Sequence, residues 1–253
     1  MNNTSINEKI DKTVDWLREK VKEANAKGLI VGVSGGIDSA VCANLIKKAF
    51  PDNSMGVILD IRNSKEDMED AKAVIEACGI ESMMLNLEPT ELNLTDMIVS
   101  NMNQKNLFKE ENKRMTVANL RARLRMCTIY AIANNLGYLV IGTDNAAELY
   151  TGYFTKYGDG GVDLLPIANI TKQEVYEWGK VLGVPSSVID KAPTAGLWEG
   201  QTDENEMGTT YAMIDKVVMG KEDEVPQRDL EIIYRMNKNS EHKRVTPPKP
   251  PKF

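Results

Sequence analysis

The stretch Leu29–Val41, LIVGVSGGIDSAV, decides the fold of this chain. It opens with aliphatic residues typical of a buried strand, breaks at Ser34, Gly35 and Gly36, and resumes with residues that suit a helix. A glycine turn between a strand and a helix binds anions, because its amides and the helix N-terminus point toward one spot. We therefore expect a phosphate group to bind at this turn.

The turn differs from two familiar phosphate-binding loops. A Walker A loop has four residues between its glycines and a Lys-Ser/Thr pair after the second, and this turn has neither. The Rossmann fingerprint reads G-x-G-x-x-G, whereas this chain has Gly32, Gly35 and Gly36. The sequence thus predicts a phosphate site of another kind.

Length and composition predict a single α/β domain. A chain of 253 residues can bury a substantial core without disulfides or metals. The formal net charge of −6 disfavours nucleic acid as a partner, and the three scattered cysteines suit neither disulfides nor zinc. Because no apolar stretch is long enough for a signal peptide or a membrane span, we expect a cytoplasmic protein with no membrane partner.

Strands and helices alternate along the first part of the chain. Strands are predicted over 29–33, 55–60, 82–87 and 138–141, and helices over 6–28, 38–50, 65–78, 116–136 and 144–150. Such βαβ units predict a doubly wound, mostly parallel sheet with helices on both faces. Ligands of these sheets bind beyond the carboxyl ends of the strands, where Ser34, Leu59 to Arg62 and Thr143 fall.

The second part of the chain has longer loops and ends in a proline-rich tail. Loops are predicted over 151–161 and 191–204, and helices over 171–182, 205–219 and 226–237. The ending RVTPPKPPKF predicts an extended segment. We expect one domain over residues 1–246 and a tail over 247–253.

Asp38 lies in the first helical turn after the glycines. A carboxylate there either caps the helix or holds a metal ion, because two neighbouring anions need a cation between them. The Ser-Gly-Gly context favours the metal. The segment SGGIDS resembles the signature of the PP-loop ATP pyrophosphatases, which implies ATP chemistry without specifying the acceptor.

Four further segments resemble the ammonia-dependent NAD synthetases. They are ARLRM (122–126), IGTDNAAELYTGYFTKYGDGGVDLLPI (141–167), APTAGLW (192–198) and SEHKR (240–244). The resemblance implies that ATP adenylylates the nicotinate carboxylate of deamido-NAD, pyrophosphate leaves, and ammonia displaces AMP to give NAD. It also implies a homodimer with the dinucleotide at the subunit interface. Only 27 residues precede Gly28, too few for an amidohydrolase domain, so free ammonia is the expected nitrogen source.

This chemistry explains the missing Walker lysine. Attack falls on the α-phosphorus, so the turn holds the departing pyrophosphate, whereas a Walker lysine serves chemistry at the γ-phosphate. Backbone amides and serine hydroxyls suit that task, because they stabilise the charge that builds on the β- and γ-phosphates. The resemblance assigns ATP contacts to Gly32, Val33, Ser34, Gly35, Gly36, Ile37, Asp38, Ser39, Thr143, Lys172 and Thr194.

The resemblance also assigns Mg²⁺ to Asp38 and Glu148, two carboxylates that follow different strands. Without the GTDNAAE motif, Glu148 would be interpreted as an ordinary exposed helix residue. Thr143 has two open roles, as an ATP contact and as the N-cap of the next helix.

Contacts to deamido-NAD are assigned by resemblance to Arg123, Lys156, Asp163, His242 and Lys243. Lysine suits phosphate oxygens, although most lysines are only solvated surface. His242 is the only histidine, and no G-x-S-x-G motif is present. A Ser-His-Asp hydrolase is therefore disfavoured.

Lys156 and Asp159 are the candidate catalytic residues, and both lie in the glycine-rich segment TGYFTKYGDGG. Ammonium must lose a proton before its nitrogen can attack, and a carboxylate is the simplest acceptor. We expect Asp159 to hold ammonium and take this proton. The alternative for Asp159 is a turn residue before Gly160.

One segment departs from the family pattern. Leu59 stands where many relatives have an arginine, and Arg62 follows three residues later.

The rival enzymes are other PP-loop ligases, such as a GMP-synthetase-type amidotransferase subunit or a tRNA-thiolating enzyme. A nucleotide sensor without catalysis is the rival from another class. The acidic composition disfavours tRNA, and a sensor is disfavoured because Asp38, Glu148, Lys156 and Asp159 are all present.

Overall fold

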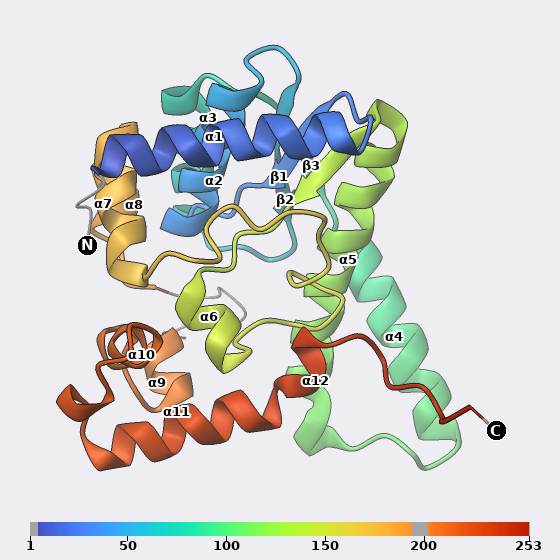
Figure 1. Cartoon of the computed structure of the whole chain (residues 1–253). Coiled ribbons are helices and arrows are strands. Elements are labelled where there is room, and N and C mark those ends of the chain that lie inside the picture. Colours follow the sequence, from blue (N-terminus) through green and yellow to red (C-terminus); the bar gives the residue numbers. More distant parts are fainter. Residues whose placement is uncertain (1–4, 194–201, 253) are drawn as a thin grey trace.

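The computed structural model describes residues 5–193 and 202–252, and its strands form one parallel sheet (Figure 1). The strands are β1 (Gly28–Gly32), β2 (Ser54–Asp60), β3 (Glu81–Asn86) and β4 (Tyr138–Ile141), in the order β3-β2-β1-β4. The chain runs outward from β1 to β3 and then returns to β4 on the other side of β1. The predicted doubly wound α/β fold is confirmed. Its switch point lies where β1 and β4 end, and ligands bind there in open sheets.

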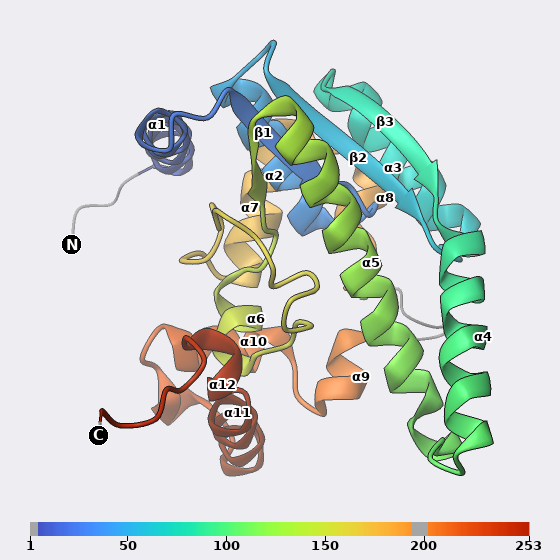
Figure 2. The ribbon, with the colours of Figure 1, turned by 90° about the vertical axis from the view of Figure 1, so that its right-hand side faces the viewer.

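Helices cover both faces of the sheet (Figure 2). On one face lie α2 (Ile37–Ala49) and α3 (Lys65–Cys78), and on the other lies α5 (Lys113–Leu136). Leu29 and Val31 of β1 enter the core on the α2 side, whereas Ile30 enters the core beneath α5. Because both faces of β1 are buried, the strand is a continuous aliphatic run.

Two further helices enlarge the core on the α2 side. They are α1 (Ile6–Glu23) and α7 (Lys172–Leu182), and both pack on α2. A capping box between Ser5 and Glu8 starts α1, whose buried stripe is Ile10, Val14, Leu17 and Val21. The helix ends at Glu23 and not near Gly28 as predicted.

Short helices form a separate layer beyond the carboxyl ends of the strands (Figure 1). They are α6 (Ala146–Thr151), α9 (Asp203–Met207), α10 (Tyr211–Val218), α11 (Gln227–Asn239) and α12 (Glu241–Arg244). Helix α8 (Ser186–Ile189) instead packs against α7. An apolar cluster joins α6 to α9, α10 and α11 and consists of Ala147, Met207, Tyr211, Ile214, Val217, Val225 and Ile233. Residues 245–252 follow as exposed chain without helix or strand.

Two further parts of the helix prediction are wrong. The single helix expected over 205–219 is split, because Gly208 ends α9 with a φ of +76° and Thr210 starts α10 by capping Met213. Helix α4 (Glu88–Gln104) is absent from the expected elements. Its only buried residue is Glu91, so it has no apolar stripe that a periodicity search would find.

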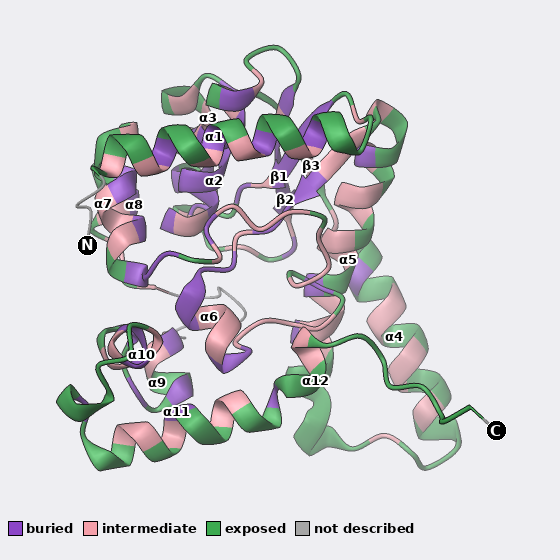
Figure 3. Cartoon of the chain, viewed as in Figure 1, coloured by how far each residue is buried: buried purple, intermediate pink, exposed green. Residues whose placement is uncertain are grey.

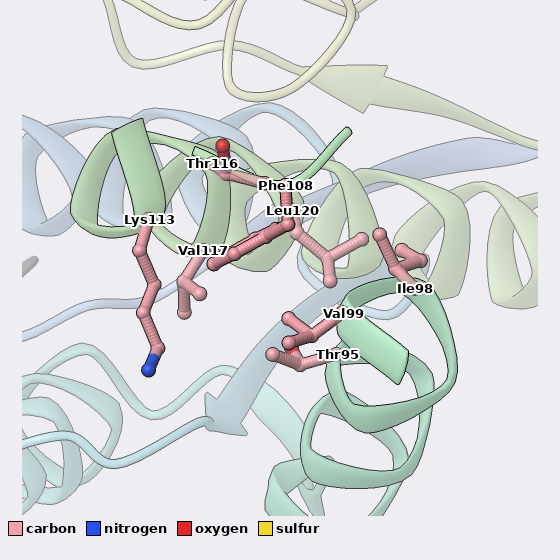
Figure 4. Close-up of a pocket in the computed structure, with 8 residues that line it drawn as sticks. All are labelled: Thr95, Ile98, Val99, Phe108, Lys113, Thr116, Val117 and Leu120. Atoms are coloured by element: carbon pink, nitrogen blue, oxygen red, sulfur yellow. The ribbon is translucent and has the colours of Figure 1, made fainter. Parts of the chain in front are cut away.

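Helices α4 and α5 pack against each other around a small apolar crevice (Figure 4). Its walls are Thr95, Ile98, Val99, Phe108, Lys113, Thr116, Val117 and Leu120. The crevice has a volume of about 10 Å³, close to the least that holds one water molecule, and we interpret it as a packing defect. Figure 3 shows that α4 and the start of α5 are otherwise largely exposed. Among the described helices, none has the length and apolar character that crossing a membrane requires.

Candidate active site

A cavity of about 580 Å³ lies at the switch point of the sheet. The β1–α2 turn, the end of β4, the start of α7, the middle of α5 and α12 all contribute to its walls. Every residue from Gly32 to Ser39 lines it. The other predicted site residues on its walls are Arg123, Thr143, Glu148, Lys156, Asp159, Lys172, His242 and Lys243.

The glycine turn is fixed by a close approach to α3 and by its own serines. Gly35 has a φ of +88°, and a Cβ at this position would lie 2.5 Å from the carbonyl oxygen of Asp67. The Ser39 hydroxyl donates to the carbonyl of Gly36 at 2.9 Å and accepts from the amide of Ser34 at 3.2 Å. Helix α2 then begins without a side-chain cap. Its N-terminus at the cavity wall is therefore suited to an anion.

We expect Gly35→Ala to lower the Tm and to raise the KM for ATP. Alanine at positive φ costs roughly 1–2 kcal/mol, and the added Cβ also meets backbone atoms that no rotamer change can move away. Gly183→Ala is the matched control, because Gly183 has a φ of +77° but no atom within 4 Å of the added Cβ. Thermal unfolding and ATP titration should separate the two variants. Equal effects at both glycines would contradict the importance of the close approach.

Lys172 joins two carboxylates from different parts of the fold. Its Nζ lies 2.6 Å from Asp38 Oδ2 and 3.2 Å from Glu148 Oε1, and its side chain is only 5% exposed. Burial lowers the pKa of Lys172, but the two carboxylates raise it and prevail, so the ammonium stays charged. Burial raises the pKa of Glu148 to about 7, with Lys172 opposing and Asp38 adding to the shift. These three residues thus form one coupled group of charges.

The two carboxylates fit the implied Mg²⁺. Each directs an oxygen toward the same cationic nitrogen, so both can contribute to one cation position. Carboxylate oxygens are the ligands that Mg²⁺ prefers, and one or two suffice when phosphates and water complete the shell. Within residues 5–193 and 202–252 no cluster of three or more candidate ligands occurs. An ion held here would therefore depend on the nucleotide for its other ligands.

Two residues that the sequence analysis does not assign hold these carboxylates. Asn145 Nδ2 donates to Asp38 Oδ1 at 2.9 Å and also caps α6 in a capping box with Glu148. The alternative role of Thr143 as the cap of this helix is therefore wrong. The Tyr211 hydroxyl lies 3.0 Å from Glu148 Oε1 and 2.9 Å from Asp203 Oδ2. The spacing of Asn145 and Glu148 could have revealed the capping box, but no local pattern reveals the contact of Asn145 with Asp38 or that of Tyr211 with Glu148.

The segment 152–162 is held from two sides. Arg123 on α5 donates to the carbonyl of Lys156 at 3.2 Å, and Lys156 Nζ donates to the carbonyl of His242 at 2.5 Å. Lys243 Nζ donates to two backbone carbonyls of the segment, at 2.7 and 2.5 Å. The structure therefore brings together four of the predicted deamido-NAD contacts from three separate parts of the chain.

Asp159 lines the cavity, whereas Asp163 does not. Asp159 Oδ1 accepts the amide of Thr155 at 3.0 Å, a contact that also suits its alternative role as a turn residue. Asp159 keeps accessible surface on the cavity side, yet the surrounding protein raises its pKa by desolvation. Asp163 accepts from the Tyr130 hydroxyl at 2.9 Å and from the amide of Val140 at 2.8 Å.

Two other residues singled out in the sequence lie apart from the cavity or outside the described chain. The guanidinium of Arg62 lies 3.2 Å from Glu88 and 3.5 Å from Glu91, and Arg62 is not on the cavity wall. Leu59, by contrast, is on that wall. Thr194 lies outside the described residues.

Comparisons with known proteins agree along nearly the whole chain. The NAD synthase family model matches residues 9–247. An NH₃-dependent NAD⁺ synthetase from Alkaliphilus oremlandii is 59% identical over 246 residues, which cover 97% of this chain and 98% of that protein. The solved structure of an NMN synthetase from Francisella tularensis has a TM-score of 0.88 and 41% identity, covering 97% of this chain and 98% of that one.

A second solved structure, an NH₃-dependent NAD synthetase from Campylobacter jejuni, has a TM-score of 0.76 and 25% identity, covering 98% of this chain and 99% of that one. These likenesses do not favour the GMP-synthetase-type alternative. The chain belongs to the NAD synthase family, as an ammonia-dependent ligase that uses ATP to form NAD.

Proposed function

We propose that the cavity at the switch point is where ATP, deamido-NAD and ammonia react, in the cytoplasm. The observation that carries the proposal is the Lys172 ammonium between Asp38 and Glu148, on the wall that the glycine turn also forms. One cavity wall therefore carries a phosphate-binding turn, two carboxylates that suit a cation, and Asp159 as a proton acceptor. Together they match the needs of adenylylation followed by amidation.

In the first half-reaction a carboxylate oxygen of the nicotinate ring attacks the α-phosphorus, and the bond to pyrophosphate breaks. The turn from Gly32 to Ser39 binds the β- and γ-phosphates as their negative charge increases. The ammonium group of Lys172 adds positive charge that stabilises the oxygens of the β- and γ-phosphates. Mg²⁺ held by Asp38 and Glu148 would neutralise phosphate charge when bound.

In the second half-reaction nitrogen attacks the acyl carbon and AMP leaves. Arg123, Lys156, His242 and Lys243 hold the dinucleotide beside Asp159, which takes a proton from ammonium. Their shared contacts with segment 152–162 mean that binding and proton transfer depend on one loop.

The proposed function is tested by incubating the protein with deamido-NAD, ATP, Mg²⁺ and ammonium. NAD, AMP and pyrophosphate should form in equal amounts, as measured by chromatography. Glutamine in place of ammonium should give no NAD. Release of ADP, or the absence of NAD, would contradict the proposal.

One observation favours nicotinate mononucleotide as a second acceptor. The TM-score of 0.88 to an NMN synthetase exceeds the 0.76 to an NH₃-dependent NAD synthetase. Amidation of the mononucleotide follows the same chemistry on a substrate that lacks the AMP half. The ratio of kcat/KM for the two acceptors, measured in parallel, decides between them.

We also propose a homodimer, with deamido-NAD near the subunit interface. Exposed apolar side chains on β3, α4, α5 and the connection between these helices support it: Met83, Met84, Leu92, Met97, Leu107 and Met115. Light scattering should give twice the chain mass of 28.2 kDa. Met97→Asp should weaken the dimer, and Met219→Asp, at an exposed methionine outside these elements, is the control. A wild-type monomer with full activity would contradict this proposal.

A further inference from the structure

Asp144 is a buried carboxylate on the cavity wall, and one of its oxygens has no hydrogen-bond partner among the described residues. It follows β4 directly after Gly142 and Thr143 and is only 5% exposed. Among the described residues, no group donates a hydrogen bond to its Oδ2 atom. A buried, unpartnered carboxylate oxygen is costly unless a ligand satisfies it, so this position calls for one.

The charges around Asp144 indicate a cation as that ligand. Burial raises the pKa of Asp144, the carboxylates of Asp159, Glu148 and Asp38 raise it further, and the Lys243 ammonium opposes them. Lys243 already donates to two backbone carbonyls, at 2.7 and 2.5 Å. Of the carboxylates, Asp38 and Glu148 share Lys172, which leaves Asp144 and Asp159 without an ion pair within the described chain.

We propose that Asp144 and Asp159 together form the subsite for ammonium, with Asp144 as the second proton acceptor. The inference rests on the proposed function and adds a residue to it. Ammonium has only N–H donors, so two carboxylates complement it in both charge and hydrogen bonding. Both residues line the same cavity as the ATP-binding turn.

Two carboxylates also balance the protons of amidation. Ammonium gives up one proton, and its freed lone pair forms the C–N bond as the C–O bond to AMP breaks, with those electrons remaining on the phosphate. The new amide nitrogen then gives up a second proton. Asp144 and Asp159 accept one proton each and return them to water after the products leave.

The test is Asp144→Asn in the full chain, assayed with ammonium and with hydroxylamine as nitrogen donors. Loss of a hydrogen bond to a charged group should raise the KM for ammonium by about 10- to 100-fold. The KM values for ATP and deamido-NAD should not change. Hydroxylamine is uncharged near neutral pH and already has a free lone pair, so hydroxamate formation should remain near the wild-type rate. Equal losses with both donors would overturn the inference.

Glu91→Gln is the matched control for removing a buried carboxylate. Glu91 is 2% exposed, its Oε2 also receives no hydrogen bond among the described residues, and it is not on the cavity wall. The control should leave the KM for ammonium unchanged. Pyrophosphate release from ATP and deamido-NAD before ammonium is added reports whether each variant still folds and adenylylates.

A measurement on the wild-type protein covers the case in which Asp144→Asn does not fold. Rb⁺ is close to ammonium in size, so it should inhibit competitively with ammonium and leave the hydroxylamine reaction unaffected. The absence of such competition would overturn the subsite. Failure of the wild-type protein to form NAD with any donor would instead overturn the proposed function.

Discussion

Asp38→Asn is expected to lower kcat/KM for NAD formation by about a thousandfold, since a bound cation contributes several kcal/mol to such a transition state. The amide keeps the shape of the carboxylate but loses its charge. It leaves Glu148 as the remaining carboxylate at the Lys172 ammonium, where Asp38 Oδ2 lies at 2.6 Å. Initial rates over a range of substrate concentrations, repeated at several Mg²⁺ concentrations, give kcat/KM and measure the loss.

Asp70→Asn is the control for this substitution. Asp70 is also buried and also lies against a lysine, with its Oδ2 2.9 Å from Lys191 Nζ, but it is not on the cavity wall. Asp70→Asn therefore removes an ion pair with a lysine, as Asp38→Asn does, but removes no proposed metal ligand. A similar fall in activity in both variants would mean that Asp38 acts through stability alone.

The turn from Gly32 to Ser39 could be predicted because its signals are local. An aliphatic strand, a break of two glycines and a helix with an early carboxylate are adjacent in the chain, and the parallel sheet then follows from the alternation of strands and helices. The residues of segment 152–162 could be assigned only through the family resemblance. Their pattern has no period of its own, and their contacts to His242 and Lys243 join residues that are 86 to 91 positions apart in the sequence.

The contacts that control charge in the cavity could not be predicted. Tyr211 reaches Glu148 from a helix 63 residues further along the chain, and its position depends on the packing of α10 against α6. The isolation of Asp144 is likewise a property of its surroundings, since its sequence context resembles that of any residue before a helix cap. Helix α4 packs against α5, but Glu91 is its only buried residue, so its sequence has no buried apolar stripe.

Lys172→Met is expected to destabilise the protein by about 3–5 kcal/mol, because it leaves buried carboxylates without their charged partner. Methionine fills a similar volume, so the loss reports charge and not a cavity. Asp38 and Glu148 would then face each other with no cation between them. Urea unfolding in the presence of EDTA measures the change in the free energy of unfolding.

Mg²⁺ should restore much of this loss, because the ion can replace the ammonium as the shared partner of the two carboxylates. In the wild-type protein Lys172 competes for the same oxygens, so the variant should show the larger rise in Tm on adding Mg²⁺. By linkage, bound Mg²⁺ should increase the free energy of unfolding by about 2.7 kcal/mol when its concentration is 100 times the Kd.

The control for the Mg²⁺ response is Lys191→Met, which removes a lysine from the pair Asp67 and Asp70, at 2.6 and 2.9 Å. That variant should lose stability without gaining a response to Mg²⁺, because α3 supplies both carboxylates and neither belongs to the proposed metal site. An equal Mg²⁺ response in both lysine variants would show that the ion binds acidic groups in general. A response in Lys172→Met alone would assign the cation position to Asp38 and Glu148 independently of catalysis.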